Sequence, residues 1–457
     1  MVRLRRTQAW SCVFAFLLSL VSFFLSAGQA WAANQSLDGA AVTKWQVAAR
    51  SVGTKNSSGA GTAGRYGNRP KAAGSRTQTG RPKPADPGLP SLSADAAVLM
   101  DVETGDVLFD KQAYKRRPPA STTKIMTSIL GLELGRPDEL VVISPKAAAV
   151  GEATLGLDQG EKLTLYELIT GALVKSGNDA CVAIAEQIAG SEEAFVRLMN
   201  EKAVTLGAHN THFANTNGLP NKAHYSCAYD LALMARYGLQ RLPAFSSIVS
   251  QKETVIRFLE PDMRMNLRNT NRLLWSYPYA DGVKTGTTDA AGKCLVASAT
   301  RDGRKLVAVV LSAPNRFQDA QRLLEWGFAR TETLTLVQAG EVLGEYPLAG
   351  QEIVRALAAE PLRASVAIND RPNLKLKVVW QRPPVLPVQA GEVLGSCELW
   401  LKGTKLRSVP LLSERTVEKK GFLSRLRLIA RTEYCAQNRE KFCSQQDFCV
   451  LSSNYVV

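Results

Sequence analysis

The 457-residue sequence has little of what a metal-binding framework needs. Its eight cysteines form no Cys-x-x-Cys pair, and it has only three histidines, His209, His212 and His224. No carboxylate stands at a recognisable metal-ligand spacing from them. A zinc peptidase is therefore a weak alternative, and we expect no metal and no cofactor.

The cysteine pattern also gives no legible disulfide framework. Cys181, Cys227 and Cys294 lie in apolar or mixed stretches, where we expect buried free thiols. The three cysteines from Cys435 to Cys449 are close enough in sequence to pair in an oxidising compartment. Three is an odd number, so their connectivity stays open.

Acidic residues are absent from residues 39–85, which contain nine lysines or arginines. Three more arginines lie near the N-terminus, so about +3 of the net charge of +15 remains for the rest of the chain. No zinc-knuckle, arginine-fork or aromatic-basic motif accompanies this charge, so we expect no nucleic-acid partner. A basic leader beside an anionic cell surface or wall is the simpler account.

The N-terminal residues 1–33 have the layout of a secretory signal peptide. The three arginines precede an uncharged apolar run from Trp10 to Ala27, and small residues end the segment at Ala32 and Ala33. The run is near the length of an uncleaved membrane anchor, so export to the periplasm or cell envelope is a firmer expectation than cleavage. Residues 34–91 are rich in Gly, Ser, Pro and basic residues and predict a disordered linker.

An α+β domain is expected over residues 92–331. Its apolar segments alternate between strand and helix patterns, and the first and last strands can share one antiparallel sheet. The expected strands are 96–100, 107–109, 282–286, 294–300 and 306–312, and the expected helices begin near 121, 163, 180 and 320.

Residues 332–412 carry short alternating segments separated by Pro and Gly, which predict a small all-β domain. The hexapeptide of residues 339–344 recurs at 390–395, which suggests two matching hairpin starts. In the tail, 413–457, Phe422 and its apolar neighbours lie on one face of a short helical pattern with basic residues nearby. This tail is a peripheral membrane contact, a docking helix or a frayed end of the chain.

Three short motifs carry chemistry. Ser121-Thr122-Thr123-Lys124 places a hydroxyl and an amine three residues apart at the start of a helix, so both point into one cleft. An amine whose pKa is lowered by burial and nearby positive charge can remove the hydroxyl proton, and a helix N-terminus favours the negative charge that develops. Alone the motif is weak, because a capped helix with a solvated lysine has the same pattern.

Taken alone, the second and third motifs are equally weak evidence for a catalytic site. Ser176-Gly177-Asn178, on a helix-to-helix turn, offers a hydroxyl to relay a proton and a carboxamide to hold a substrate amide. Lys284-Thr285-Gly286, on an apparent strand, offers a cation, a hydroxyl and a glycine that lets a substrate backbone approach closely. Together, in this order and on these elements, the three motifs are far more specific than any one of them.

On these motifs the chain resembles a D-alanyl-D-alanine carboxypeptidase of the low-molecular-mass penicillin-binding class. Flanking stretches support the resemblance, which covers residues 92–412: they are 118–127, 269–275 and 281–286. The resemblance implies a penicillin-recognition catalytic domain followed by a β-rich domain. It also implies peptidoglycan stem peptides as substrate and β-lactams as covalent inhibitors.

The resemblance also implies roles for residues. Ser121 would be acylated, Lys124 would accept its proton, Ser176 would shuttle protons, and Lys284 with Thr285 would grip the terminal carboxylate. The backbone N–H groups of Ser121 and Thr287 would form the oxyanion hole. Asn178 and Gly286 would contact the substrate as described above, and Arg316 would help to hold the carboxylate.

Three alternatives remain at this point. A class A β-lactamase needs a carboxylate that activates water, and residues 202–252 contain no Glu, so penicillin is expected to stay on Ser121. A non-catalytic wall-binding or β-lactam-sensing module has no use for Lys124. A D,D-endopeptidase that cuts cross-links would use the same residues and differ only in its leaving-group pocket. The basic leader and the cysteine-bearing tail are not part of the family pattern.

Overall fold

The structure is a computed structural model that describes residues 88–348, 352–381 and 386–419. The predicted signal peptide, nearly all of the predicted linker, the three C-terminal cysteines and the predicted tail helix lie outside these residues. No helix among the described residues is long and apolar enough to cross a membrane. Leu92, where the sequence predicts that order begins, is buried.

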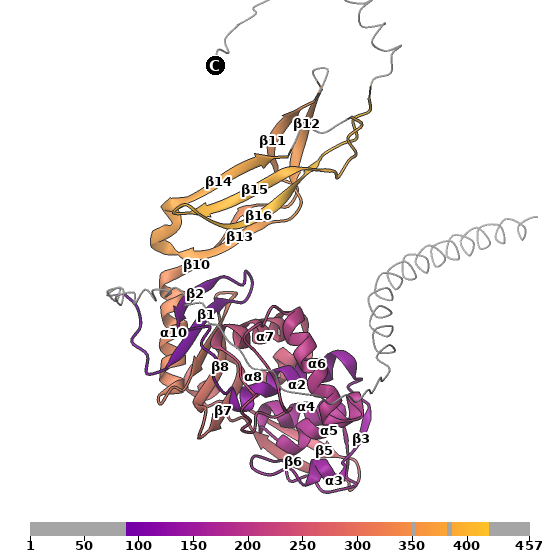
Figure 1. Ribbon diagram of the computed structural model, residues 1–457. Helices are drawn as coiled ribbons and strands as arrows, with labels where there is room; N and C mark the ends of the chain where they lie inside the picture. Colours follow the sequence, from indigo (N-terminus) through magenta and orange to yellow (C-terminus); the bar gives the residue numbers. More distant parts are fainter. Residues whose placement is uncertain (1–87, 349–351, 382–385, 420–457) are drawn as a thin grey trace, which may run out of the picture. The chain divides into compact units, whose positions relative to one another are not determined.

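The first part of the described chain is built on a five-stranded antiparallel sheet in the order β2-β1-β9-β8-β7 (Figure 1). The strands β1 and β9 are buried on both faces, because their alternate residues enter two separate hydrophobic clusters. The first and last parts of the domain therefore share one sheet, as predicted. The five strands are β1 (Ala96–Asp101), β2 (Val107–Lys111), β7 (Ala280–Thr288), β8 (Gly292–Arg301) and β9 (Arg304–Leu311).

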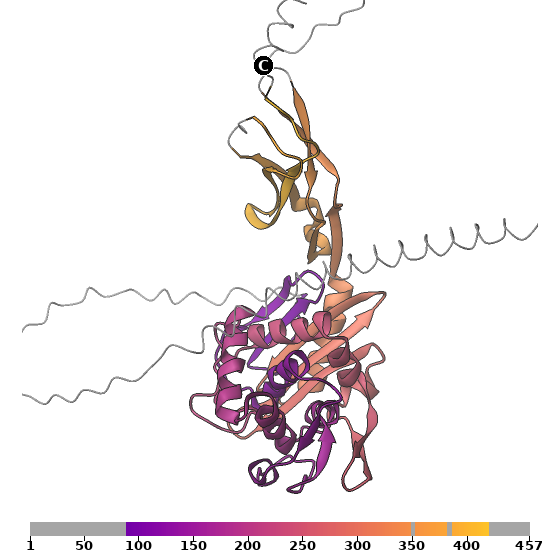
Figure 2. The same cartoon turned by 90° about the vertical axis from the view of Figure 1, so that its right-hand side faces the viewer.

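Helices cover both faces of this sheet (Figure 2). One face packs against the helical block that lies between β2 and β7 in the chain, and the other packs against α10. The helical block carries two small β-ribbons, β3–β4 and β5–β6. Its elements and those that follow are η2 (Ala120–Thr123), α2 (Lys124–Leu134), β3 (Leu140–Val142), α3 (Pro145–Ala148), β4 (Lys162–Thr164), α4 (Leu165–Val174), α5 (Asn178–Ala189), α6 (Glu192–Thr205), α7 (Ala228–Arg241), α8 (Pro243–Ser250), β5 (Glu253–Phe258), β6 (Met263–Arg268), α9 (Leu273–Ser276) and α10 (Arg316–Arg330).

Two predicted helix starts differ from the structure in a way that matters locally. The helix predicted from Ser121 begins with the 3-10 turn η2, and only from Lys124 does it continue as α2. The helix predicted from Leu163 begins at Leu165, because Thr164 caps it through a reciprocal capping box with Glu167. The residues just before the cap form β4 instead.

The second part of the described chain is all-β, with its own hydrophobic core. It has a five-stranded sheet in the order β11-β12-β16-β15-β14 and a separate pair, β10–β13. Val417 is buried in this core, beyond the predicted end at residue 412. The elements are β10 (Thr331–Val337), β11 (Val342–Pro347), β12 (Ile353–Ala358), β13 (Leu362–Ala367), η3 (Ile368–Asn373), β14 (Leu374–Trp380), β15 (Val393–Leu401) and β16 (Thr404–Ser413).

The repeated hexapeptide forms the same turn twice. Gly340 and Gly391 both have positive φ, and each starts a turn that leads into a strand, β11 or β15. The glutamates that follow accept from the backbone N–H three residues earlier, at 2.7 Å from Gln338 and 2.9 Å from Gln389. The two stretches are thus matching strand starts.

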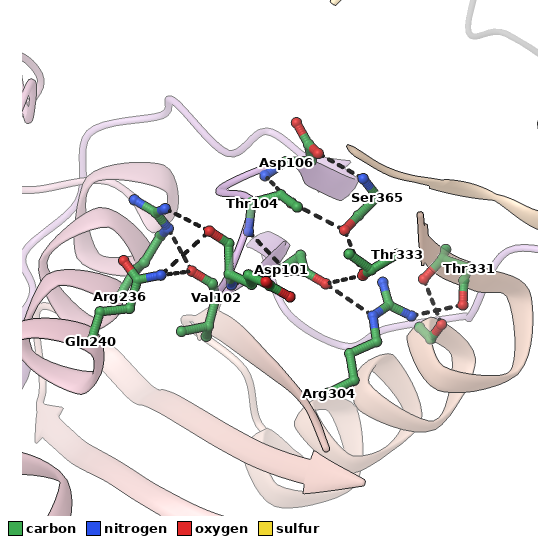
Figure 3. Close-up of polar contacts among 12 residues, drawn as sticks. Asp101, Val102, Thr104, Asp106, Arg236, Gln240, Arg304, Thr331, Thr333 and Ser365 are labelled. Carbon is green, nitrogen blue, oxygen red and sulfur yellow. Dashed lines mark hydrogen bonds and ion pairs between the residues drawn. The ribbon is translucent and has the colours of Figure 1, made fainter. Parts of the chain in front are cut away.

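A polar network joins the two parts where the β1–β2 turn meets β13 (Figure 3). At its centre the buried Asp101 carboxylate accepts from Arg304 Nε at 2.9 Å and from Thr333 Oγ1 at 2.8 Å. Ser365 Oγ lies 3.0 Å from Thr104 Oγ1 and 2.8 Å from Thr333 Oγ1. Because its members come from β1, β9, β10 and β13, the network fixes these four strands to one another.

Candidate functional site

The structure places the amine of Lys124 against the hydroxyl of Ser121. Nζ lies 3.0 Å from Ser121 Oγ, and it donates to Asn178 Oδ1 at 2.8 Å and to the Asn217 carbonyl at 2.8 Å. A neutral amine has two hydrogens and one lone pair. The two carbonyl oxygens take the hydrogens, so the lone pair is left facing the hydroxyl.

Lys124 is fully buried, which excludes the solvated lysine that the motif alone allowed. Burial lowers the pKa of Lys124 from 10.5 to about 8, against smaller opposing effects of nearby acidic groups, chiefly Cys181. No carboxylate forms an ion pair with Lys124 among the described residues. The neutral form of the amine is therefore accessible near neutral pH.

The second motif occupies the turn between α4 and α5. Ser176 has φ of 75°, an uncommon backbone conformation for a residue with a side chain, and Gly177 and Asn178 begin α5. Both ends of the Asn178 carboxamide are used within the protein, because its Nδ2 donates to the Gly151 carbonyl at 2.9 Å. One N–H of that amide remains for a substrate. Within the described chain, the Ser176 hydroxyl forms no hydrogen bond to Ser121 or Lys124.

The third motif lies on β7, which is one of the two edge strands of the sheet. Lys284 is fully buried, and its amine donates to the Thr285 carbonyl at 3.1 Å. Burial, and next the positive charge of Lys124, hold the pKa of Lys284 well below 10.5. The Thr285 hydroxyl lies 2.7 Å from Thr270 Oγ1. The sequence predicted this strand. The burial of Lys284 excludes the alternative interpretation of the motif, in which the lysine is solvated on an edge strand.

Two glycines let the backbone pack around Ser121. A Cβ on Gly286 would lie 3.0 Å from the Ser121 nitrogen, so β7 passes directly beside the start of η2. A Cβ on Gly218 would lie 1.9 Å from the Ala120 carbonyl oxygen, and its φ is +92°. Ala120 itself has φ of 49°. The turn that presents Ser121 is therefore held in an unfavourable backbone conformation by close packing on both sides.

Arg316, at the start of α10, reaches back to the same strand. Its Nη1 donates to the Gly286 carbonyl at 2.9 Å and to Thr287 Oγ1 at 2.8 Å. The structure thus connects eight of the nine predicted site residues around one stretch of β7, and the ninth, Ser176, lies two residues before Asn178 in the turn that leads into α5. The eight are Ser121, Lys124, Asn178, Lys284, Thr285, Gly286, Thr287 and Arg316.

Comparison with known proteins decides the family. The family model described as D-alanyl-D-alanine carboxypeptidase matches residues 83–315, and the model described as penicillin-binding protein 5, C-terminal domain, matches residues 332–419. The chain belongs to the D-alanyl-D-alanine carboxypeptidase family. The predicted family and the predicted fold class are both confirmed.

Individual carboxypeptidases of this family align over most of their length. The chain is 36% identical to DacF of Bacillus subtilis over 347 residues, which is 73% of this chain and 88% of the relative. It is 35% identical to DacC of Escherichia coli over 356 residues, 74% of this chain and 87% of the relative. Penicillin-binding protein 5 from Haemophilus influenzae superposes with a TM-score of 0.65 at 30% identity, covering 72% of this chain and 99% of that structure.

Sequence reasoning missed several residues that support this carboxypeptidase site. Asn217, whose carbonyl accepts from Lys124, lies in an Asn-Thr-Asn-Gly-Leu-Pro turn that carries no chemical signature. Asp179 is buried at the start of α5 and accepts from the backbone N–H groups of residues 155–157. It thereby fixes the loop that flanks Asn178.

The rings of His212 and His224 have hydrogen-bond partners within the protein, His212 through the Ala223 carbonyl at 2.7 Å. His224 is buried, with its Nδ1 accepting from the Ala214 N–H at 3.0 Å and its Nε2 2.8 Å from Thr123 Oγ1, which donates to the Ala120 carbonyl. Burial lowers the pKa of His224 to about 4. No group of three or more His, Cys, Asp or Glu in the described ranges is placed to hold a metal ion. His224 instead supports the turn that carries Ser121.

Proposed function

We propose that the protein is a serine-type carboxypeptidase that removes the terminal D-alanine from peptidoglycan stem peptides ending in D-Ala-D-Ala. The observation that carries the proposal is the buried amine of Lys124, which lies 3.0 Å from Ser121 Oγ and is held by the carbonyl oxygens of Asn178 and Asn217. A binding module would gain nothing from burying an amine at this cost. A serine nucleophile does gain from a buried amine, because burial lowers the amine's pKa and lets it act as the base.

In the first half of the reaction, neutral Lys124 takes the proton of Ser121 as Oγ attacks the carbonyl carbon of the penultimate D-alanine. The oxygen that becomes negative is bound by the N–H groups of Ser121 and Thr287. The C–N bond then breaks, and the leaving amine of the last D-alanine takes up a proton, relayed through the Ser176 hydroxyl. An ester on Ser121 and free D-alanine result.

In the second half, water attacks the ester carbon and gives its proton to Lys124, and the bond to Ser121 Oγ breaks as the hydroxyl regains its proton. The shortened peptide leaves with a new carboxylate. With β-lactams the leaving group stays tethered to the acyl group and the ester is long-lived. We therefore propose that β-lactams are covalent inhibitors.

The clamp for the terminal carboxylate consists of Lys284, Thr285 and Arg316. In the free protein the pKa of Lys284 is held well below 10.5, first by burial and then by the positive charge of Lys124. A substrate carboxylate placed against it favours the charged amine and offsets both effects. Substrate binding should therefore raise the pKa of Lys284.

We further propose that the protein is exported and works in the cell envelope. The signal-like segment of residues 1–33 and the basic stretch after it support this location. The contact of the C-terminal tail with a membrane stays a prediction from its sequence pattern.

The test is release of D-alanine from a pentapeptide that ends in D-Ala-D-Ala. We expect turnover by the wild type, none by Ser121→Ala, and unchanged turnover by the matched control Ser247→Ala, whose side chain is exposed on α8. Mass spectrometry of penicillin-treated protein should find one adduct, on Ser121. An adduct on another residue, or D-alanine release by Ser121→Ala, would overturn the proposal.

A further inference from the structure

A large basic pocket lies against the clamp. It has a volume of about 1060 Å³, and five of the residues that line it are cations, while none is acidic. Lys175 directly precedes Ser176, and Arg316 contacts Gly286 and Thr287, so the pocket borders two of the three motifs. The cations are Lys175, Arg268, Arg272, Lys293 and Arg316.

These charges are largely uncompensated. Of these five cations, only Arg268 has an ion-pair partner in the part of the chain that the structure describes. That partner is Glu253, at 3.6 Å, and both side chains are exposed. The Nε of Arg316 is buried and makes no hydrogen bond. Burial lowers the pKa of Arg316, and the positive charge of Arg272 lowers it further. Such an arrangement favours binding of an anion.

The walls of the pocket suit an amino-acid side chain with a charged end. Trp275 is 38% exposed and stacks on Arg268 at 5.1 Å from its ring centroid, which supplies an apolar surface. The first turn of α10 adds the backbone N–H groups of Phe317 and Gln318, since those of Asn315 and Arg316 donate to Ser93 Oγ and the Ala313 carbonyl. It also brings the positive end of a fifteen-residue helix to the pocket. The acidic residue of that turn, Asp319, is engaged elsewhere by Ser93 and Ala94.

The position of the pocket says which part of the substrate reaches it. The proposed clamp grips the carboxylate of the leaving residue, and Thr270 and Arg316, which contact the clamp strand, form the near wall of the pocket. Atoms beyond the clamp therefore belong to the leaving group and not to the acyl part on Ser121. D-alanine has only a methyl group to place there.

We propose that this pocket is a leaving-group subsite that selects a leaving residue with a second carboxylate. The proposal rests on the proposed function, because it uses the same nucleophile and clamp. It deepens that function by naming the substrate class: peptides in which the residue after the scissile D-alanine is dicarboxylic, as a cross-linked acidic peptide can be. An exposed guanidinium contributes modestly to an ion pair, so the selection is expected to be about fivefold.

The experiment compares leaving residues that differ in one charge. Acyl-D-Ala-X substrates carry as X either D-glutamate or D-glutamine, and in a longer pair D-2-aminoadipate or its side-chain amide. We expect kcat/KM for the acid to exceed that for the amide about fivefold in at least one pair, and the ratio to fall toward one at high salt. Arg272→Gln should lower the ratio about threefold, while Lys375→Gln, on the exposed face of β14, should leave it unchanged.

The ratio is internal to each protein, so a variant that folds less well does not disturb it. Binding of the same peptides to Ser121→Ala gives a readout without turnover, and the acid should again bind more tightly. Acid and amide behaving alike in both pairs, or a ratio unaffected by Arg272→Gln, would overturn the subsite. Failure to release D-alanine from D-Ala-D-Ala would instead overturn the proposed function.

Discussion

The most direct consequence of the site is a pH dependence set by the burial of Lys124. With a pKa of 10.5, about one lysine in 3,000 is neutral at pH 7, whereas at a pKa of about 8 roughly one in 11 is neutral. Burial thus raises the population of the reactive base roughly 300-fold. If Lys124 is the base, the rate of acylation should follow this population.

The assay is the rate of acylation at saturating fluorescent penicillin, which separates the chemical step from binding. The rate should rise roughly eightfold between pH 6.5 and 7.5 and level off above pH 9, with a midpoint at about 8. In Lys124→Arg the guanidinium cannot be deprotonated in this pH range, so the acylation rate should fall at least about 1,000-fold. A flat profile, or a midpoint near 10.5, would refute the reasoning.

A second variant shifts the midpoint without touching the reacting groups. Glu152 is exposed, and its charge raises the pKa of Lys124. Glu152→Gln should therefore move the midpoint of the rise in acylation rate with pH to a lower pH. Glu360→Gln, an exposed change in the β-rich part, should not. An unchanged midpoint in Glu152→Gln would show that another group controls the limb.

Three further outcomes are expected. His224 has a pKa of about 4 in the folded protein, below its unfolded value, so the folded protein binds fewer protons. The free energy of unfolding should therefore drop by roughly 3 kcal/mol as the pH falls from about 6.5 to 4. Urea titrations should show a smaller drop in His224→Asn. Gly218→Ala should abolish penicillin labelling and lower the free energy of unfolding by more than about 2 kcal/mol. The control Gly190→Ala is also at positive φ, but a Cβ there has no atom within 4 Å. It should lower the free energy of unfolding by only about 1 kcal/mol and keep labelling. Asp101→Asn should lower the free energy of unfolding by about 3–5 kcal/mol in thermal and urea unfolding, because Arg304 loses its buried partner. A loss of less than about 1 kcal/mol would contradict the role given to the network in Figure 3.

Much of the fold was legible in the sequence because its signals are local. Alternating and continuous apolar runs predicted β1, β2, β7, β8 and β9, and helical spacing predicted α2, α4, α5 and α10 within a few residues. The three motifs also named the residues that meet at β7, since each motif is a short stretch whose chemistry depends on residue types and spacing.

The tertiary structure alone decided how those residues act. That Lys124 and Lys284 are buried, and which carbonyl oxygens hold the Lys124 amine, depends on Asn217 and on packing between segments far apart in the chain. The basic pocket combines residue 175, the stretch 268–275, residue 293 and the stretch 314–318, so no single short window of sequence contains it. Spacing along the chain determines residue type and periodicity, whereas desolvation and charge proximity arise only when distant segments are brought into contact.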